Sequence, residues 1–152
     1  MSEIGDSIQT KCLAFGDRII KLNDFLLEQA SRRCDVRGKM YEGKSHQPSS
    51  FSHHPSRIPV HLQSVAALAN QLLRSGTSIG ANNAEATSAI SKADFKSKSY
   101  IALKEARESL YWLELLHRNN YLTDVQFNSL YGDCEELVRV LTHRCKKLDG
   151  VE

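Results

Sequence analysis

Apolar residues near the N-terminus return at alternating intervals of four and three, a spacing that places them on one face of an α-helix. The series is Ile8, Cys12, Phe15, Ile19, Leu22 and Leu26. A second line lies about a hundred degrees round the same helix, and it consists of Leu13, Ile20 and Leu27. Two apolar lines are more than one core contact needs. The pattern therefore predicts a helix with neighbours on two sides, one of them a second subunit.

The periodicity stops between about Ser31 and Arg57, where Ser, His, Gly and Pro accumulate. Pro48 and Pro55 exclude a continuous helix there. We therefore expect a long flexible loop at about 31–57. A loop of this length in a compact domain is usually either functional or disordered.

Helical periodicity resumes near Pro59, a residue suited to the first turn of a helix. The same segment contains Gly76 and Gly80, and each glycine costs about 1 kcal/mol relative to alanine inside a helix. Two interpretations are open. Either a neighbouring helix approaches the backbone closely at these glycines, or the helix breaks there.

Capping residues mark two further helices. Ser91 and Asp94 resemble a capping pair for a helix that ends near Arg118, and Thr123 with Gln126 forms a capping box for the last helix. The last helix keeps the three-and-four spacing through Phe127, Leu130, Cys134, Leu137, Leu141, Cys145 and Leu148. Four amphipathic helices without a strand pattern predict an all-α fold. We expect residues 1–152 to form a single domain, an antiparallel up-down four-helix bundle.

Composition adds limits on function. The chain has 152 residues, 41% hydrophobic, and its net charge of +2 is too balanced to indicate a nucleic-acid binder by itself. It has no apolar run of about 20 residues and no signal-peptide pattern, so we expect a cytoplasmic protein without membrane contact. The cysteines Cys12, Cys34, Cys134 and Cys145 form no C-x-x-C pair, which is typical of free thiols in a reducing compartment.

Three segments carry a resemblance to a known family: QLLRSGTSIGAN (71–82), KADFKSK and IALKEARESLYWLELL (101–116). From about Gln71 to Leu148 the chain resembles the bacterial four-helix bundle proteins encoded by intervening sequences of large-subunit ribosomal RNA genes, the S23 family. The resemblance implies a cytoplasmic protein without catalysis or cofactor, assembled as a ring-shaped homopentamer. A related barrel, the accessory variability protein of diversity-generating retroelements, binds reverse transcriptase and nucleic acid. The chain departs from the family in its long loop, and in Asn83 where an aliphatic residue is usual.

Eight positions match the polar pattern of that family. They are Arg74, Ser78, Asn82 and Glu85 on the second helix, and Lys104, Glu105, Glu108 and Trp112 on the third. Intervals of four, four and three place the first four residues on one helix face. If the two faces meet, Arg74 or Lys104 can pair with Glu85 or Glu105 and fix the register of the bundle or ring.

Metal binding and catalysis have weak support. Glu114 and His117 spell one Glu-x-x-His element, whereas a di-iron bundle site needs two such elements and further glutamates. The histidines His46, His53, His54 and His61 with Cys34 fit no zinc spacing. We find no nucleophile motif and no glycine-rich phosphate loop. We therefore expect no metal, no cofactor and no enzymatic activity, and a metal-dependent enzyme is the third hypothesis for function.

Positive charge gathers locally. Basic residues of the expected loop include Arg32, Arg33, Arg37, Lys39, Lys44 and Arg57, those opening the third helix are Lys92, Lys96 and Lys98, and those closing the fourth are Arg139, Arg144, Lys146 and Lys147. Repeated around a ring, these groups would attract phosphate backbones without base specificity. Alternatively they are solvated or favour helix C-termini. The first hypothesis is a scaffold that binds structured RNA or a ribonucleoprotein, and the second is a protein-binding adaptor without a nucleic-acid role.

Overall fold

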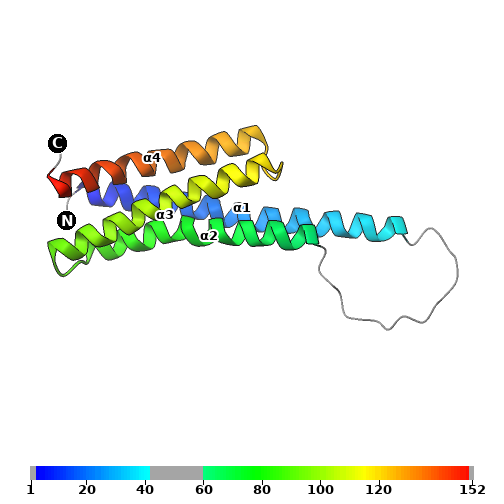
Figure 1. Ribbon diagram of the computed structural model, residues 1–152, viewed down its shortest axis with the longest axis horizontal. Helices are drawn as coiled ribbons and strands as arrows, with labels where there is room; N and C mark the ends of the chain where they lie inside the picture. The colour runs from blue at the N-terminus through cyan, green and yellow to red at the C-terminus, as the bar shows by residue number, and fades with distance from the viewer. Residues whose placement is uncertain (1–2, 42–59, 151–152) are drawn as a thin grey trace.

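The computed structural model describes residues 3–41 and 60–150, with side chains in 7–32 and 63–150. The described residues form four helices and no strand: α1 (Glu3–Tyr41), α2 (Val60–Thr87), α3 (Lys92–Arg118) and α4 (Asp124–Asp149). Each helix runs antiparallel to the one before it, so the two chain ends lie at the same end of the bundle (Figure 1). The all-α, up-down four-helix fold is confirmed for this part of the chain. None of the described helices is long and apolar enough to cross a membrane.

The first part of the predicted loop is helical. α1 continues to Tyr41, so the expectation of a loop from about Ser31 is wrong up to that residue, and 42–59 lie outside the described residues. Ser31–Tyr41 contains no proline, and five of its eleven residues are the good helix formers Arg, Lys and Met. Arg32 and Glu28 add an ion pair of 2.6 Å at i,i+4. The apolar periodicity ended because α1 leaves the core, not because the helix ends.

The predicted apolar line of α1 is the part of that helix that enters the core. Its six residues are all buried, and they pack in one cluster with apolar residues of α2, α3 and α4. Three cysteines of this cluster, Cys12, Cys134 and Cys145, are buried free thiols. Burial raises the pKa of Cys12 to about 11 and that of Cys134 to about 12, so both remain protonated and unreactive at neutral pH.

Gly76 and Gly80 lie where α1 crosses close to α2. A Cβ atom added at Gly76 would lie 3.1 Å from Ile19 Cγ1, and one added at Gly80 would lie 3.3 Å from Cys12 Cβ. α2 is continuous through both glycines, so the alternative of a broken helix is wrong. Because the two glycines have no side chain, the α1 backbone can approach α2. This close packing compensates for the low helix propensity of glycine.

The predicted caps are present. Ser91 Oγ accepts a hydrogen bond of 3.1 Å from Asp94 N at the start of α3. Thr123 and Gln126 form the reciprocal capping box of α4. Between these helices Asn120 takes a left-handed φ of 59°, which asparagine tolerates better than most residues. These local signals set the helix boundaries within a few residues.

The four helices do not pack equally. α1 with α2, α2 with α3, and α3 with α4 form long seams, while α1 and α4 touch over a much shorter stretch. The end of α1 extends past both the start of α2 and the α3–α4 turn (Figure 1). The bundle therefore has one open side, between α1 and α4, and one projecting helix end.

Candidate functional site

The family-pattern residues do not form the ion-pair network that the sequence suggested. Glu85 binds Lys98 of α3, so the prediction that Glu85 pairs with Arg74 or Lys104 is wrong. The reason is the antiparallel turn between α2 and α3, which sets the end of α2 against the start of α3. Lys104 is six residues further along α3, a rise of about 9 Å along the helix axis.

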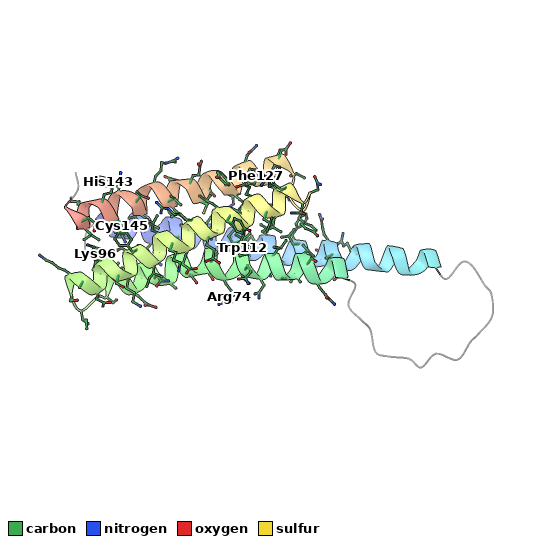
Figure 2. The ribbon with its side chains drawn as sticks, viewed as in Figure 1. Arg74, Lys96, Trp112, Phe127, His143 and Cys145 are labelled. Atoms are coloured by element: carbon green, nitrogen blue, oxygen red, sulfur yellow. The ribbon has the colours of Figure 1, made fainter. Side chains whose placement is uncertain are left out.

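Glu105 lies in a partly buried, mixed electrostatic environment. Burial and the neighbouring Glu108 raise the pKa of the Glu105 carboxyl, while Lys104 and Arg74 oppose that rise. Arg74 is therefore near enough to act on Glu105, yet the two form no ion pair within 4 Å in the part of the chain that the structure describes. Arg74 and Trp112 both lie near the middle of the bundle (Figure 2).

The remaining pattern residues bond mainly within their own helices. Asn82 Nδ2 donates to the Ser78 carbonyl oxygen at 2.9 Å, and Trp112 Nε1 donates to Glu108 Oε1 at 3.0 Å. Trp112 is half-buried and packs against the core cluster rather than inside it. These contacts stabilise α2 and α3, and they assemble no catalytic group.

Asn83, the departure from the family pattern, joins three helices. Its side chain is fully buried. Asn83 Nδ2 donates to Gln9 Oε1 of α1 at 2.6 Å, and Arg144 Nη1 of α4 donates to Asn83 Oδ1 at 2.7 Å. The Arg144 guanidinium lies 5.6 Å from the ring centroid of Phe95 in α3, within cation–π range. A buried polar cluster thus joins the helices at this end of the bundle.

The predicted basic residues divide into paired and unpaired groups. Lys98 binds Glu85, Lys96 binds Asp149 at 2.7 Å, and Arg32 binds Glu28. Among the described residues, no ion-pair partner lies within 4 Å of Lys92, Lys146 or Lys147. α3 begins and α4 ends at the same end of the bundle, where Figure 2 labels Lys96, His143 and Cys145. Arg33, Arg37 and Lys39 belong to the projecting end of α1, and their side chains lie outside the described ones.

The second apolar line of α1 lies on the surface. Leu13 is 60% exposed, Ile20 46% and Leu27 36%. Leu13 and Ile20 border a shallow hollow of about 280 Å³ between α1 and α2, whose other wall is built from small residues that include Gly80 and Ala84. The sequence located this line correctly, but no other described part of the chain covers it.

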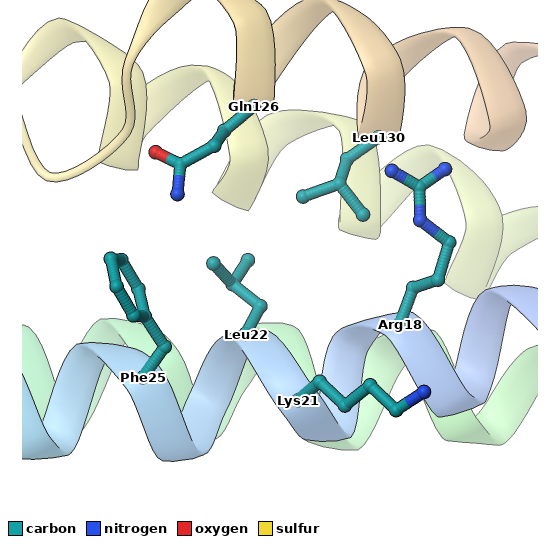
Figure 3. A pocket seen from close by; sticks show the side chains of 6 residues that line it. All are labelled: Arg18, Lys21, Leu22, Phe25, Gln126 and Leu130. Carbon is teal, nitrogen blue, oxygen red and sulfur yellow. The ribbon is translucent and has the colours of Figure 1, made fainter.

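The open side between α1 and α4 contains a cleft of about 250 Å³ (Figure 3). Six side chains line it: Arg18, Lys21, Leu22, Phe25, Gln126 and Leu130. A second hollow of about 470 Å³ adjoins it at the α3–α4 turn and shares Phe25 and Gln126. Sequence reasoning missed this site. Its residues come from opposite ends of the chain, and their spacing within each helix carries no signal of a cleft.

The candidate metal residues have other partners. His117 lies 2.8 Å from Asp124 Oδ1 and stacks on Phe127, and Glu114 faces Arg118 at 3.7 Å. Within the described residues there is no group of three or more His, Cys, Asp or Glu side chains that could hold a metal ion. The predicted histidine cluster falls at His46, His53 and His54, outside the described residues, and the side chain of His61 is likewise outside them.

Comparison with known proteins fixes the family. Residues 59–143, which span α2, α3 and most of α4, match the model of the 23S rRNA-intervening sequence proteins. This chain belongs to that family. A crystal structure from Bacteroides thetaiotaomicron, described as a protein of unknown function from the S23 ribosomal protein family, is 35% identical and has a TM-score of 0.70. The similarity covers 94% of this chain and 98% of that one. No protein of curated function matches the sequence.

Membership of the 23S rRNA-intervening sequence protein family confirms the resemblance, and the family match covers residues 59–143. The matched segment contains Asn83 and the polar pattern of α2 and α3, but it does not include α1. The cleft residues Arg18, Lys21 and Phe25 therefore lie outside the family match, although the related crystal structure has a counterpart for most of the chain.

Proposed function

We propose that this 23S rRNA-intervening sequence protein is a non-enzymatic scaffold that self-assembles as a ring, a pentamer, and binds structured RNA or a ribonucleoprotein. Binding is electrostatic and does not read the sequence. The observation that supports this proposal best is the projecting end of α1. The basic residues that the sequence assigned to a loop belong to a helix that leaves the bundle.

The projecting helix has the charge that a phosphate backbone attracts. Ser31–Tyr41 contains four basic residues, Arg32, Arg33, Arg37 and Lys39, and one acidic residue, Asp35. A helix that carries several basic residues can contact the phosphates that border an RNA groove without entering it. RNA would be bound by backbone and shape, because the deep major groove of A-form RNA hides its base edges.

The opposite end of the bundle offers a second basic surface. Lys92 opens α3, while Lys146 and Lys147 close α4, and these three lysines have no ion-pair partner within 4 Å among the described residues. Lys96 and Lys98 were candidates of equal rank, but their charges are already compensated by Asp149 and Glu85. Unpaired lysines bind phosphate without first breaking an internal contact, so we assign the main role at this end to Lys92, Lys146 and Lys147.

Self-association is supported by the uncovered apolar line of α1. Leu13, Ile20 and Leu27 recur every seven residues, so they form a seam on one side of the helix. A surface of this kind beside a groove of small residues is suited to receive a helix of another copy. A ring would repeat both basic surfaces around its axis and increase RNA affinity through multivalency.

The test is fluorescence anisotropy with nuclease-treated, tag-free protein and three probes: a structured RNA, a matched DNA duplex and heparin. Each probe is titrated at low and physiological salt. We expect RNA binding that weakens steeply with salt, because phosphate contacts release counterions. Absence of RNA binding at low salt contradicts the proposal.

Variants locate the basic surface. Replacing Arg33, Arg37 and Lys39 with Gln should reduce both the affinity and the salt slope, and so should the triple replacement of Lys92, Lys146 and Lys147. The matched control is Lys96→Gln with Lys98→Gln. It removes two charges that are compensated within the bundle, so we expect a smaller loss of RNA affinity per charge removed.

The ring is tested separately. Size-exclusion chromatography with light scattering should give five times the protomer mass. The double variant Leu13→Lys, Ile20→Lys should reduce that mass to one protomer without loss of helicity. A monomeric wild-type protein would contradict the assembly part of the proposal but not the RNA-binding part.

A protein-binding adaptor without a nucleic-acid role is the second candidate. It is favoured by the same uncovered apolar line of α1, because Leu13 and Ile20 beside their hollow could also receive a helix of a different protein. A pull-down with and without nuclease separates the two functions, because an adaptor keeps its partner after all RNA is removed.

A further inference from the structure

The α1–α4 cleft combines four chemical features within one small hollow. An aromatic ring comes from Phe25, an apolar floor from Leu22 and Leu130, an amide from Gln126, and a cationic rim from Lys21 and Arg18 (Figure 3). Ligand sites are typically apolar hollows with a few convergent polar groups. The combination therefore suggests a ligand that consists of a flat, partly polar ring and carries a negative charge.

The Gln126 amide has a fixed orientation. Thr123 N and Thr123 Oγ1 both donate to Gln126 Oε1, each at 3.0 Å, as part of the capping box. A backbone N–H can only donate, so the amide atom that faces it must be the oxygen. The NH₂ group is consequently turned into the cleft between Phe25 and Leu22 (Figure 3), and it makes no hydrogen bond within the described chain. The helix cap thus holds a hydrogen-bond donor in place for a ligand.

The aromatic wall and the floor set the shape of that ligand. Phe25 is 37% exposed, and its ring stands upright at the mouth of the cleft (Figure 3). Leu22 and Leu130 are almost completely buried beneath it. A planar heterocycle placed between the Phe25 ring and the floor of Leu22 and Leu130 would cover apolar surface with both of its faces. Stacking of a nucleobase on an aromatic side chain tolerates any base, because every base has a π face.

The charged rim is suited to a phosphate. Arg18 binds Asp133 of α4 and donates to Ser129 Oγ at 2.8 Å, so its charge is largely compensated. Lys21, by contrast, has no ion-pair partner within 4 Å among the described residues. Asp124, the acidic residue of the adjoining hollow, is turned toward His117. Among the residues that line the cleft, the cation without an ion-pair partner is therefore Lys21.

We propose that this cleft binds a single unpaired nucleotide, with its base between Phe25 and the Leu22–Leu130 floor, a base acceptor on the Gln126 amide and its phosphate at Lys21. The inference rests on the proposed RNA-binding function and deepens it, because it states that the structured RNA must offer an extruded or looped nucleotide. The two adjoining hollows together have the size of ordinary ligand sites, about 300–1,000 Å³.

The experiment uses the fluorescent base 2-aminopurine in three probes. The first is an RNA hairpin with 2-aminopurine in its loop, the second has the same base in the paired stem, and the third is free 2-aminopurine ribonucleoside monophosphate. Stacking on Phe25 should quench the loop probe at least about two-fold on saturation and leave the stem probe unchanged. The full-length, tag-free protein is used at low salt, with anisotropy recorded on the same samples.

Three variants test the three contacts. Phe25→Leu keeps the apolar volume but removes the ring, and it should abolish quenching and weaken loop-RNA binding at least about five-fold. Gln126→Glu preserves the capping box but replaces the NH₂ donor with a carboxylate, so it should weaken binding to a similar extent. Lys21→Gln should weaken binding more than Lys104→Gln, which removes one exposed lysine charge on α3. Phe25→Trp should restore quenching, and thermal melts confirm that each variant folds.

The outcomes separate the two proposals. If loop and stem probes bind equally and Phe25→Leu changes neither, the cleft proposal is overturned while electrostatic RNA binding stands. If the free nucleotide binds as tightly as the loop RNA, with the same dependence on Phe25, the cleft is supported and its ligand is a free nucleotide. If no probe binds at low salt, both proposals are overturned.

Discussion

α1 meets its two neighbours in opposite ways. Against α2 it packs buried apolar side chains onto glycine, with Ile19 over Gly76 and Cys12 over Gly80. Against α4 it reaches across with long polar side chains, with Lys11 bound to Glu136 at 2.5 Å and Arg18 bound to Asp133. The first seam is close and apolar, and the second is polar and partly open.

This difference explains where a ligand can enter. Glycine allows two helix axes to approach, so the buried side chains of α1 fill the space between the helices, and the hollow that remains is a shallow one at the surface. Pairs of long side chains hold helices apart, and the apolar residues beneath them, Leu22 and Leu130, become the floor of a cleft. The free energy of unfolding should therefore depend mainly on the α1–α2 seam. The binding of a ligand in the cleft should depend on the α1–α4 side.

The largest expected effect is from Ile19→Ala. Ile19 is fully buried over Gly76, which has no side chain to fill the space that a shortened Ile19 would leave. We expect a loss of about 3–4 kcal/mol in the free energy of unfolding, from lost burial plus a cavity. Urea unfolding followed by circular dichroism measures it. Val125→Ala in α4 is the control, because Val125 is 80% exposed, and its loss in the free energy of unfolding should be below about 1 kcal/mol.

The next largest effect is expected at Asn83, which connects α2 to both α1 and α4. Asn83→Leu removes the acceptor of Arg144 and the donor to Gln9 while filling similar space. We expect a loss of about 2 kcal/mol in the free energy of unfolding, because the polar groups of Arg144 and Gln9 lose their buried partner. A double-mutant cycle with Arg144→Met measures the coupling. Additive losses would show that the two side chains do not depend on each other.

Glycine-to-alanine replacements separate the close seam from open helix surface. Gly76→Ala should lower stability by about 1 kcal/mol, since the new Cβ would press on Ile19 and the strain exceeds the gain in helix propensity. Gly132→Ala in α4 should raise stability by about 1 kcal/mol, because its Cβ meets no atom within 4 Å. Thermal unfolding of the two variants should shift in opposite directions. Equal shifts would contradict the close approach of α1 and α2.

The smallest effect comes from the polar seam. The hydrogen bond from Lys11 lowers the pKa of Glu136 below its ordinary value of 4.5. A carboxyl with a lowered folded pKa stabilises the protein above its unfolded pKa, and this contribution is lost as the pH falls through the folded value. Lys11→Gln should therefore reduce the fall in Tm between pH 7 and pH 3, whereas Lys92→Gln, which removes a lysine without an ion-pair partner among the described residues, should leave that fall unchanged. An identical acid dependence in Lys11→Gln and wild type would show that the exposed pair contributes nothing.

Local patterns predicted most of the fold. Capping pairs at Ser91 and Thr123 fixed two helix starts, and the glycines of α2 indicated a close neighbour before that neighbour was known. The predictions were wrong where a segment has no packing partner. Ser31–Tyr41 lost its apolar period and was taken for a loop, yet a helix that projects into solvent needs no such period.

The candidate site was less predictable. Partners of Glu85 and Lys96 could not be assigned from spacing along one helix, because both bind residues of another helix. The cleft at Phe25 and Gln126 could not be predicted either, because about a hundred residues separate its two walls along the chain. Asn83 did give a signal, as a polar residue at a position that is usually aliphatic, and the structure supplies its partners.

The sequence by itself determined the helices, their caps, the buried face of each helix and the family, because these depend on interactions between residues a few positions apart. Tertiary structure alone decided which lysines remain unpaired, how Asn83 is satisfied and where the bundle stays open. Those properties depend on how far each helix slides and turns against its neighbours. A shift of one turn, about 5.4 Å, would change every partner across the α1–α4 side without altering a single helix.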